Sequence, residues 1–161
     1  IKSPESIVGK MRRKELPLTL EAVFTNLHDI AGIRLIVRFL SDIKTVEDLL
    51  ATQADLKVLK VKDYIHHPKA NGYQSLHLIL GVPIYTVDGP NMIEVELQIR
   101  TIAMNFWASL EHELNYKKNV PNQAALRHSL TEKAHLITQL DQEMDDIKER
   151  MYDQQPPKHE I

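Results

Sequence analysis

A chain of 161 residues with a formal net charge of -2 and no cysteine has room for one domain with a sizeable hydrophobic core. The absence of cysteine excludes a disulfide framework, a thiolate nucleophile and a zinc site built from cysteines, and the charge argues against a surface made entirely for nucleic acid. No apolar run approaches the roughly 20 residues of a transmembrane helix, and no signal peptide is visible. We therefore expect a soluble, cytoplasmic protein with no membrane partner.

Two short helices are expected before the first strand. Ser3 and Pro4 form a good helix start, because serine caps a helix and proline suits its first position. This helix should end near Lys14, and Thr19 can cap the second one. Alternating apolar residues then predict a strand over residues 33–40.

Helices and strands alternate through the rest of the chain. Asp42 is expected to cap a helix, and strands are predicted over residues 56–63, at a sheet edge, and over 76–85 and 92–100. A turn at residues 88–90 should separate the last two strands. Amphipathic patterns predict helices over residues 101–118 and 122–152. This order indicates an α+β or α/β domain with a mixed sheet.

The strand at 92–100 places polar residues on one face. One carboxylate on this face and one upstream of the first strand are candidate metal ligands. Asp29 lies just before the first strand, and Glu96 lies in the middle of the polar face. If the two strands are neighbours, these carboxylates can hold one Mg²⁺ ion, which prefers oxygen ligands and keeps waters for substrate phosphates. Both could equally be exposed acids, and Glu94 on the same face could be the true ligand or a bystander.

Residues 69–77 have the composition of a nucleotide-binding loop. Lys69 offers a phosphate contact, Tyr73 can stack on a base, and His77 carries a hydrogen-bonding imidazole. The alternative is an ordinary turn in which Tyr73 and His77 pack in the core.

The first helix is rich in basic residues. Lys10 and Arg13 lie one helical turn apart and can grip phosphates, although such cations often form only a solvated face. The neighbouring His28-Asp29 pair invites comparison with helical metal-dependent phosphohydrolases. Those proteins need further His and Asp ligands on helices, whereas this pair leads into a β-patterned run, so we reject that interpretation. We expect His28 to be structural or to support a site residue from behind.

Several separated motifs, in order, resemble the synthetase domain of the RelA/SpoT family, which makes (p)ppGpp. The matching segments are KSPESI at residues 2–7, HDIAGIR at 28–34, DYIHHPKANGYQSLH at 63–77, ELQIRT at 96–101 and NFWA at 105–108. The chain is most similar to the small stand-alone alarmone synthetases of the RelQ-like group. This resemblance implies a nucleotidyltransferase-like fold with about five strands, a catalytic core over residues 1–118, a helical extension over 119–153 and a flexible tail over 154–161.

The resemblance implies a GTP/GDP pyrophosphokinase, which transfers pyrophosphate from ATP to the 3′-hydroxyl of GDP or GTP and makes the stringent-response alarmones. Asp29 and Glu96 would coordinate Mg²⁺, and Glu96 would also accept the proton of the attacking hydroxyl. Such transfer depends mostly on positioning and on neutralising phosphate charge.

The resemblance assigns the other site residues as well. The ATP-binding residues would be Lys2, Lys10, Arg13 and Arg34, with Arg34 stacking on adenine. The GDP- or GTP-binding residues would be Lys69, Asn71, Tyr73 and His77, with Tyr73 stacking on guanine. The family pattern also has an arginine just ahead of Lys2. The sequence begins at Ile1, and we expect that arginine to be lost to truncation or disorder rather than replaced.

Relatives of this group form homotetramers through terminal helices, and some are stimulated by (p)ppGpp at a central cleft, where Asn105 matches one position. We therefore expect a homotetramer, the alternative being a helix that merely covers the sheet. A second functional hypothesis is a catalytically weak regulator that binds nucleotide or single-stranded RNA on the same scaffold. That regulator would not need Asp29 and Glu96. The basic tetrapeptide at residues 60–63 varies between family members near the acceptor site, but the sequence does not fix GDP or GTP preference.

Overall fold

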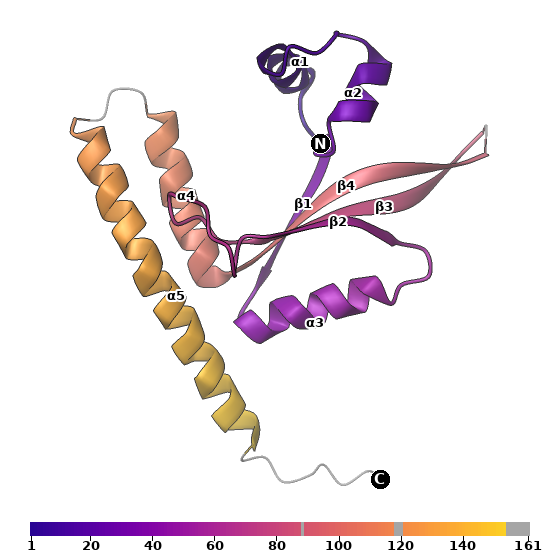
Figure 1. Ribbon diagram of the computed structural model, residues 1–161. Helices are drawn as coiled ribbons and strands as arrows, with labels where there is room; N and C mark the ends of the chain where they lie inside the picture. Colours follow the sequence, from indigo (N-terminus) through magenta and orange to yellow (C-terminus); the bar gives the residue numbers. More distant parts are fainter. Residues whose placement is uncertain (88, 118–120, 154–161) are drawn as a thin grey trace, which may run out of the picture. The chain divides into compact units, whose positions relative to one another are not determined.

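The computed structural model describes residues 1–87, 89–117 and 121–153, and within them the chain forms five helices and four strands (Figure 1). In chain order these elements are α1 (Pro4–Arg13), α2 (Leu20–Asn26), β1 (Ala31–Val37), α3 (Leu40–Ala51), β2 (Lys57–Asp63), β3 (Leu76–Thr86), β4 (Gly89–Thr101), α4 (Ile102–Tyr116) and α5 (Gln123–Asp153). No helix among them is both long enough and apolar enough to cross a membrane.

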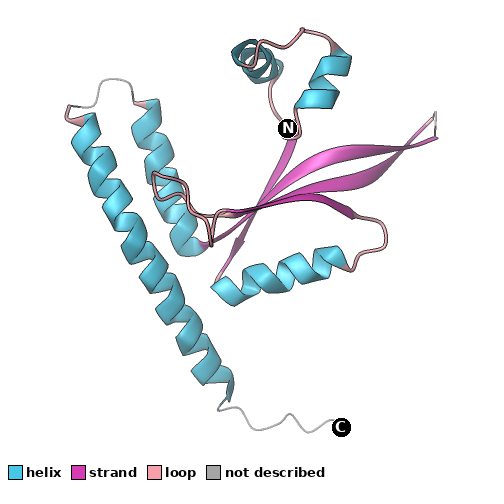
Figure 2. Ribbon diagram, in the orientation of Figure 1, coloured by secondary structure: helices cyan, strands magenta, loops and turns pink. Residues whose placement is uncertain are grey.

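The strands form one sheet in the order β1-β4-β3-β2 (Figure 2). The expected mixture of helices and strands is therefore confirmed, and β2 lies at the sheet edge as predicted. The expectation of about five strands is corrected to four, because each of the four predicted strand segments supplies one strand and the other described residues are helical or lie in turns and loops.

Side-chain caps fix the starts of three helices. Ser3 Oγ accepts a hydrogen bond from the backbone N–H of Ser6 at 3.3 Å, Thr19 Oγ1 caps α2 in the same way at 3.2 Å, and Thr101 Oγ1 caps α4 at 3.1 Å. The predicted cap at Asp42 is wrong. Asp42 lies inside the first turn of α3, and its carboxylate reaches back to the N–H of Phe39 at 3.2 Å, which is the reverse half of a capping box.

The alternation in β4 separates a core face from a polar face. Val95, Leu97 and Ile99 are buried, whereas Glu96 and Gln98 remain partly accessible. The strand starts at Gly89, earlier than predicted, and position 88 of the expected turn lies outside the described residues. The expected tail at 154–161 also lies outside them.

The chain divides into two compact units, which are described separately below. The first unit contains Ile1–Leu35, Glu47–Lys62 and Leu76–Gln98, and the second contains Ile36–Val46, Asp63–Ser75 and Ile99–Ile161. In the second unit α4 and α5 pack against each other, and their core includes Tyr73, Trp107, Ala108 and Ala134.

Candidate active site

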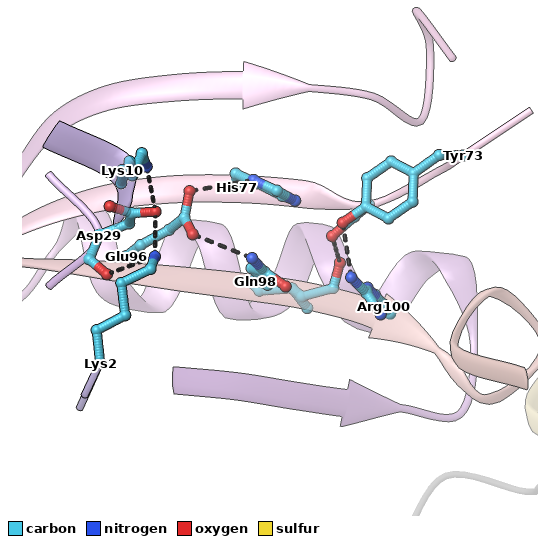
Figure 3. Close-up of polar contacts among 10 residues, drawn as sticks. Lys2, Lys10, Asp29, Tyr73, His77, Glu96, Gln98 and Arg100 are labelled. Atoms are coloured by element: carbon cyan, nitrogen blue, oxygen red, sulfur yellow. Dashed lines mark hydrogen bonds and ion pairs between the residues drawn. The ribbon is translucent and has the colours of Figure 1, made fainter. Parts of the chain in front are cut away.

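In the first unit, two lysines converge on Asp29. Lys2 lies just before α1, Lys10 lies in its last turn, and Asp29 lies two residues before β1. The Nζ atoms of Lys2 and Lys10 are each 2.5 Å from Asp29 Oδ2 (Figure 3). The backbone N–H of Lys2 also donates to the carbonyl oxygen of Ile30 at 2.9 Å, which holds the start of the chain beside this carboxylate.

Asp29 is an ionised carboxylate with spare ligand capacity. Burial raises its pKa, but the hydrogen bonds from Lys10 and Lys2 outweigh that effect and lower the pKa to about 2. Within the described residues, Oδ1 is buried and accepts no hydrogen bond. An ionised oxygen without a donor is suited to a cation, so this side chain fits a Mg²⁺ ligand.

Glu96 is the second ionised carboxylate, in the middle of β4. Its Oε1 lies 3.3 Å from His77 Nδ1, and its Oε2 accepts a hydrogen bond from Gln98 Nε2 at 3.0 Å (Figure 3). The hydrogen bond with His77 is the main cause that lowers the pKa of Glu96 to about 2, against an opposing effect of burial. At neutral pH this side chain is therefore a good metal ligand and a weak base.

Both carboxylates line one cleft of about 280 Å³ in the first unit. Lys2 and Arg34 line it with them, as does Gln98, to which the sequence assigned no role. Among the described residues no group of three or more His, Cys, Asp or Glu side chains is placed to hold a metal ion. Two carboxylates still fit Mg²⁺, because this ion usually takes one or two from the protein and the rest of its ligands from waters and phosphates.

Three other polar residues lie apart from this cleft. Arg13 does not line it. The Arg13 guanidinium lies beside Gly9 of the same helix, where an added Cβ would be 3.7 Å from Nη1. Glu94 forms an ion pair with His28 Nδ1, and neither residue lines the cleft. This arrangement fits the structural role expected for His28 and favours Glu96 over Glu94 as the metal ligand.

In the second unit, three of the four predicted acceptor residues, Lys69, Asn71 and Tyr73, lie in a tight loop between β2 and β3, whereas His77 lies in β3. The carboxylate of Asp63 accepts hydrogen bonds from the backbone N–H groups of Ile65 and His66 at 2.8 and 3.0 Å. The N–H of Gly72 donates to the carbonyl oxygen of Lys69 at 2.8 Å, and Gly72 has a φ of 88°, a conformation that favours glycine. The loop is thus held by its own backbone.

Tyr73 is packed more deeply than a simple stacking surface would be. Its side chain is only 9% exposed, and its hydroxyl accepts a hydrogen bond from Arg100 Nη2 at 2.7 Å (Figure 3). Lys69 Nζ lies 4.7 Å from the ring centroids of both Tyr73 and Tyr64. A base that stacks on Tyr73 would compete with these cations for the ring, which is closer to the core alternative that the sequence left open.

Arg100 is a residue that sequence reasoning missed. The alternation of β4 placed it on the polar face, yet it is only 5% exposed and its guanidinium lies 5.0 Å from the centroid of Tyr73. A buried arginine is nearly always paired with a specific partner. The position of Arg100 at the end of a buried strand is therefore the signal that could have identified it.

The remaining predicted residues have separate contacts. Asn71 Oδ1 accepts from the N–H of Tyr73 at 3.2 Å, and its Nδ2 donates to Glu111 Oε1 at 3.1 Å. Asn105 lies on α4, and its Oδ1 is buried with no hydrogen-bond partner among the described residues. His77 belongs to the first unit with Glu96, whereas Lys69, Asn71 and Tyr73 belong to the second.

Comparisons with known proteins agree with the resemblance. Residues 1–121 match the family described as "Region found in RelA / SpoT proteins". The GTP pyrophosphokinase YwaC of Bacillus subtilis is 47% identical over 153 residues, which cover 94% of this chain and 72% of YwaC. The crystal structure of small alarmone synthetase 1 from Bacillus subtilis bound to its product pppGpp matches with a TM-score of 0.83 and 39% identity, over 94% of this chain and 76% of that one. The same synthetase bound to AMPCPP matches with a TM-score of 0.72 and 35% identity, over 95% and 76%.

Proposed function

The chain belongs to the RelA/SpoT family, and on that premise we propose that it is a GTP pyrophosphokinase. It transfers the β,γ-pyrophosphate of ATP to the 3′-hydroxyl of GDP or GTP, so that ATP and GDP become AMP and ppGpp. The observation that carries this proposal is the pair of ionised carboxylates, Asp29 and Glu96, that line one cleft with Lys2 and Arg34. A module that only bound nucleotide or RNA would have no need of that pair.

The donor nucleotide is assigned to the first unit. The ammonium groups of Lys2 and Lys10 both bind one anionic oxygen, Asp29 Oδ2. A phosphate oxygen of ATP could replace this carboxylate oxygen as their partner. When both lysines bind the phosphates of ATP, Asp29 is free to join Glu96 as a ligand of Mg²⁺, which neutralises phosphate charge when bound. Arg34 offers a planar guanidinium for stacking on adenine, and Arg13 would add a further phosphate contact.

Glu96 contributes chiefly as a ligand in this proposal. A carboxylate with a pKa of about 2 is poorly matched to accepting a proton near neutral pH. Phosphoryl transfer through a loose transition state makes little demand on a base, because the attacking hydroxyl loses its proton late. The proton-accepting role that the resemblance gave Glu96 is therefore secondary to holding the metal.

The acceptor nucleotide is assigned to Lys69, Asn71, Tyr73 and His77. Lys69 Nζ lies over the rings of Tyr64 and Tyr73, and its charge can bind a phosphate. Tyr73 would stack its ring on guanine, and the amide of Asn71 can leave Glu111 and form a hydrogen bond with an edge of the base instead.

We also propose that the enzyme is located in the cytoplasm.

We further propose that the protein is a homotetramer joined through its terminal helices. Large apolar side chains of α5 are exposed at helical spacing, namely Leu136, Leu140, Met144, Ile147 and Met151. Asn105, whose Oδ1 has no hydrogen-bond partner in the described part of the chain, is the proposed contact for a (p)ppGpp effector. Sedimentation of the protein at micromolar concentration should give a tetramer, and a monomer alone would overturn this assembly.

The activity has a simple test. The protein is incubated with Mg²⁺, ATP and GDP, and the nucleotides are separated by anion-exchange chromatography. We expect AMP and ppGpp in equal amounts, and neither product when Mg²⁺ is chelated. Consumption of ATP to ADP with no ppGpp, or no reaction at all, would overturn the proposed function.

A further inference from the structure

Helix α5 is in close contact with the acceptor loop, where Ala134 packs against Gly72. A Cβ added at Gly72 would lie 2.4 Å from the Cβ of Ala134, a distance that real side chains do not reach. Ala134 is only 6% exposed, so no space remains on its side of the contact. The position of α5 therefore limits where the backbone of Gly72 can lie.

One helical turn further along α5, a side chain holds the other end of the same loop. Thr138 Oγ1 lies 3.1 Å from Gln74 Oε1 and also 3.1 Å from the carbonyl oxygen of Ala134, so these two acceptors share its single proton, and Gln74 is 7% exposed. Tyr73 lies between these two contacts, and it packs in the same cluster as Ala134. A shift at either Gly72 or Gln74 would move its ring.

Helix α5 is itself fixed on both sides of these contacts. Before them, Trp107 Nε1 donates a hydrogen bond to the carbonyl oxygen of Leu130 at 2.7 Å. After them, the buried carboxylate of Asp141 accepts a hydrogen bond from Thr101 Oγ1 at 2.6 Å. Because α5 is held at both points, the positions of Ala134 and Thr138 are fixed, and they in turn fix the loop that packs against them.

We propose that Ala134 and Thr138 are positioning residues for the acceptor nucleotide, because they set the conformation of residues 69–74. This inference rests on the proposed function, in which that segment binds GDP or GTP. Neither residue is among the proposed nucleotide-binding residues, and both belong to the second unit, whereas the donor residues belong to the first. Changes at these two positions should therefore alter the affinity for GDP and leave that for ATP unchanged.

The first variant, Ala134→Val, adds two methyl groups against Gly72. We expect the KM for GDP to rise about tenfold, with the KM for ATP and kcat within twofold of the wild type. Ala134→Ser, which is close to alanine in size, should restore the KM. His135→Val is the matched control, because it places the same β-branched residue at an exposed neighbouring position.

The second variant, Thr138→Val, keeps the shape of the side chain and removes the hydroxyl. Water can reach this position, so we expect a smaller rise, about threefold to fivefold, in the KM for GDP, and recovery in Thr138→Ser. If Thr138 acts through Gln74, then Gln74→Leu should raise the KM by itself, and adding Thr138→Val should change nothing more.

Binding and folding are measured apart from activity. Calorimetric titration with GDP gives the affinity, thermal unfolding shows that each variant is folded, and emission from the sole tryptophan, Trp107, reports on the cluster. Failure of the wild type to make ppGpp would refute the proposed function alone. An active wild type with folded Ala134→Val and Thr138→Val variants that bind GDP normally would overturn the positioning role. Equal rises in the KM for GDP and for ATP would overturn it too.

Discussion

The two groups of predicted site residues differ in how they are held. In the first unit, Asp29 and Glu96 are fixed by charge-assisted hydrogen bonds from lysine, imidazole and amide groups beside an accessible cleft. In the second unit, Tyr73 is almost inaccessible, because it packs against Trp107 and Ala134 and its hydroxyl accepts a hydrogen bond from the buried Arg100. The difference indicates that the donor side depends on electrostatics, which salt and pH perturb, and that the acceptor side depends on shape, which changes of side-chain volume perturb.

The largest effect should come from removing one carboxylate of the cleft. Glu96→Gln keeps the side-chain volume but removes the charge that a metal ligand needs, so we expect kcat to fall by about 10²- to 10³-fold or more with the fold intact. Rates of ppGpp formation and circular dichroism together check this. The matched control is Glu94→Gln, on the same face of β4, which should retain activity near that of the wild type. A Glu96→Gln variant that turned over normally would remove Glu96 from the site.

The next effect should come from the aromatic ring of the acceptor loop. Tyr73→Ala should weaken GDP binding by about 5- to 150-fold, the equivalent of the ~1–3 kcal/mol that stacking on one base contributes. Tyr73→Phe keeps the ring and loses only the hydrogen bond with Arg100, so its effect should be smaller. Tyr85→Ala, which changes an exposed tyrosine, is the control for equilibrium titrations with GDP. Unchanged GDP affinity in Tyr73→Ala would show that the ring serves only the core.

A moderate effect should distinguish the two sides by their response to salt. Lys10→Ala should raise the KM for ATP about tenfold, because a charged hydrogen bond to phosphate is lost. Raising the salt concentration in the wild type should increase the KM for ATP more steeply than the KM for GDP, since salt screens ion pairs that solvent can reach, as in this accessible cleft. Steady-state kinetics across a salt series checks both statements. A steeper response for GDP would reverse the comparison.

The smallest effect should be on stability at acid pH. The folded-state pKa values of Asp29 and Glu96 are lowered to about 2, so their contribution is present above their ordinary values of 3.8 and 4.5 and is lost as the pH falls toward 2. Urea unfolding at pH 6 and pH 3 should therefore show a smaller loss of stability in Glu96→Gln than in the wild type. Equal losses would contradict the lowered pKa of Glu96.

Asp141 provides the opposite sign in the same experiment. Burial raises its pKa, so its contribution is present below the ordinary value and is lost as the pH rises through the folded-state pKa. Asp141→Asn should therefore abolish the decrease in stability that Asp141 causes as the pH rises from 3 to 6. The substitution also weakens the hydrogen bond with Thr101. An acid-linked loss in Asp141→Asn like that of the wild type over this range would leave Asp141 without a titrating role.

The elements of the fold were predictable because their signals are local. Alternating residues located three strands and an apolar run located the fourth, β3, and Ser3 and Thr19 marked the helices that they cap. Asp42 was misplaced because an acid stabilises a helix start both as a cap and from within the first turn, and the sequence does not separate the two positions. The expectation of a fifth strand came from the resemblance and from no alternating segment in the chain.

The contacts of the site were less predictable because they join distant residues. Lys2 and Asp29 are 27 residues apart, and nothing in either motif predicts that the lysines occupy the carboxylate itself. The burial of Tyr73 depends on α5, some sixty positions along the chain, so the loop sequence favoured stacking and left packing open as the alternative. The pairing of Glu94 with His28 likewise became visible only in three dimensions.

The division between the two sides is tested most directly by one crossed calorimetric titration. Lys10→Ala and Tyr73→Ala are each titrated, in the presence of Mg²⁺, with a non-hydrolysable ATP analogue and with GDP. We predict that Lys10→Ala loses affinity for the ATP analogue and keeps that for GDP, and that Tyr73→Ala does the reverse. Equal loss of both ligands in both folded variants, or the opposite crossing, would contradict the assignment of ATP to the charged cleft and of GDP to the packed loop.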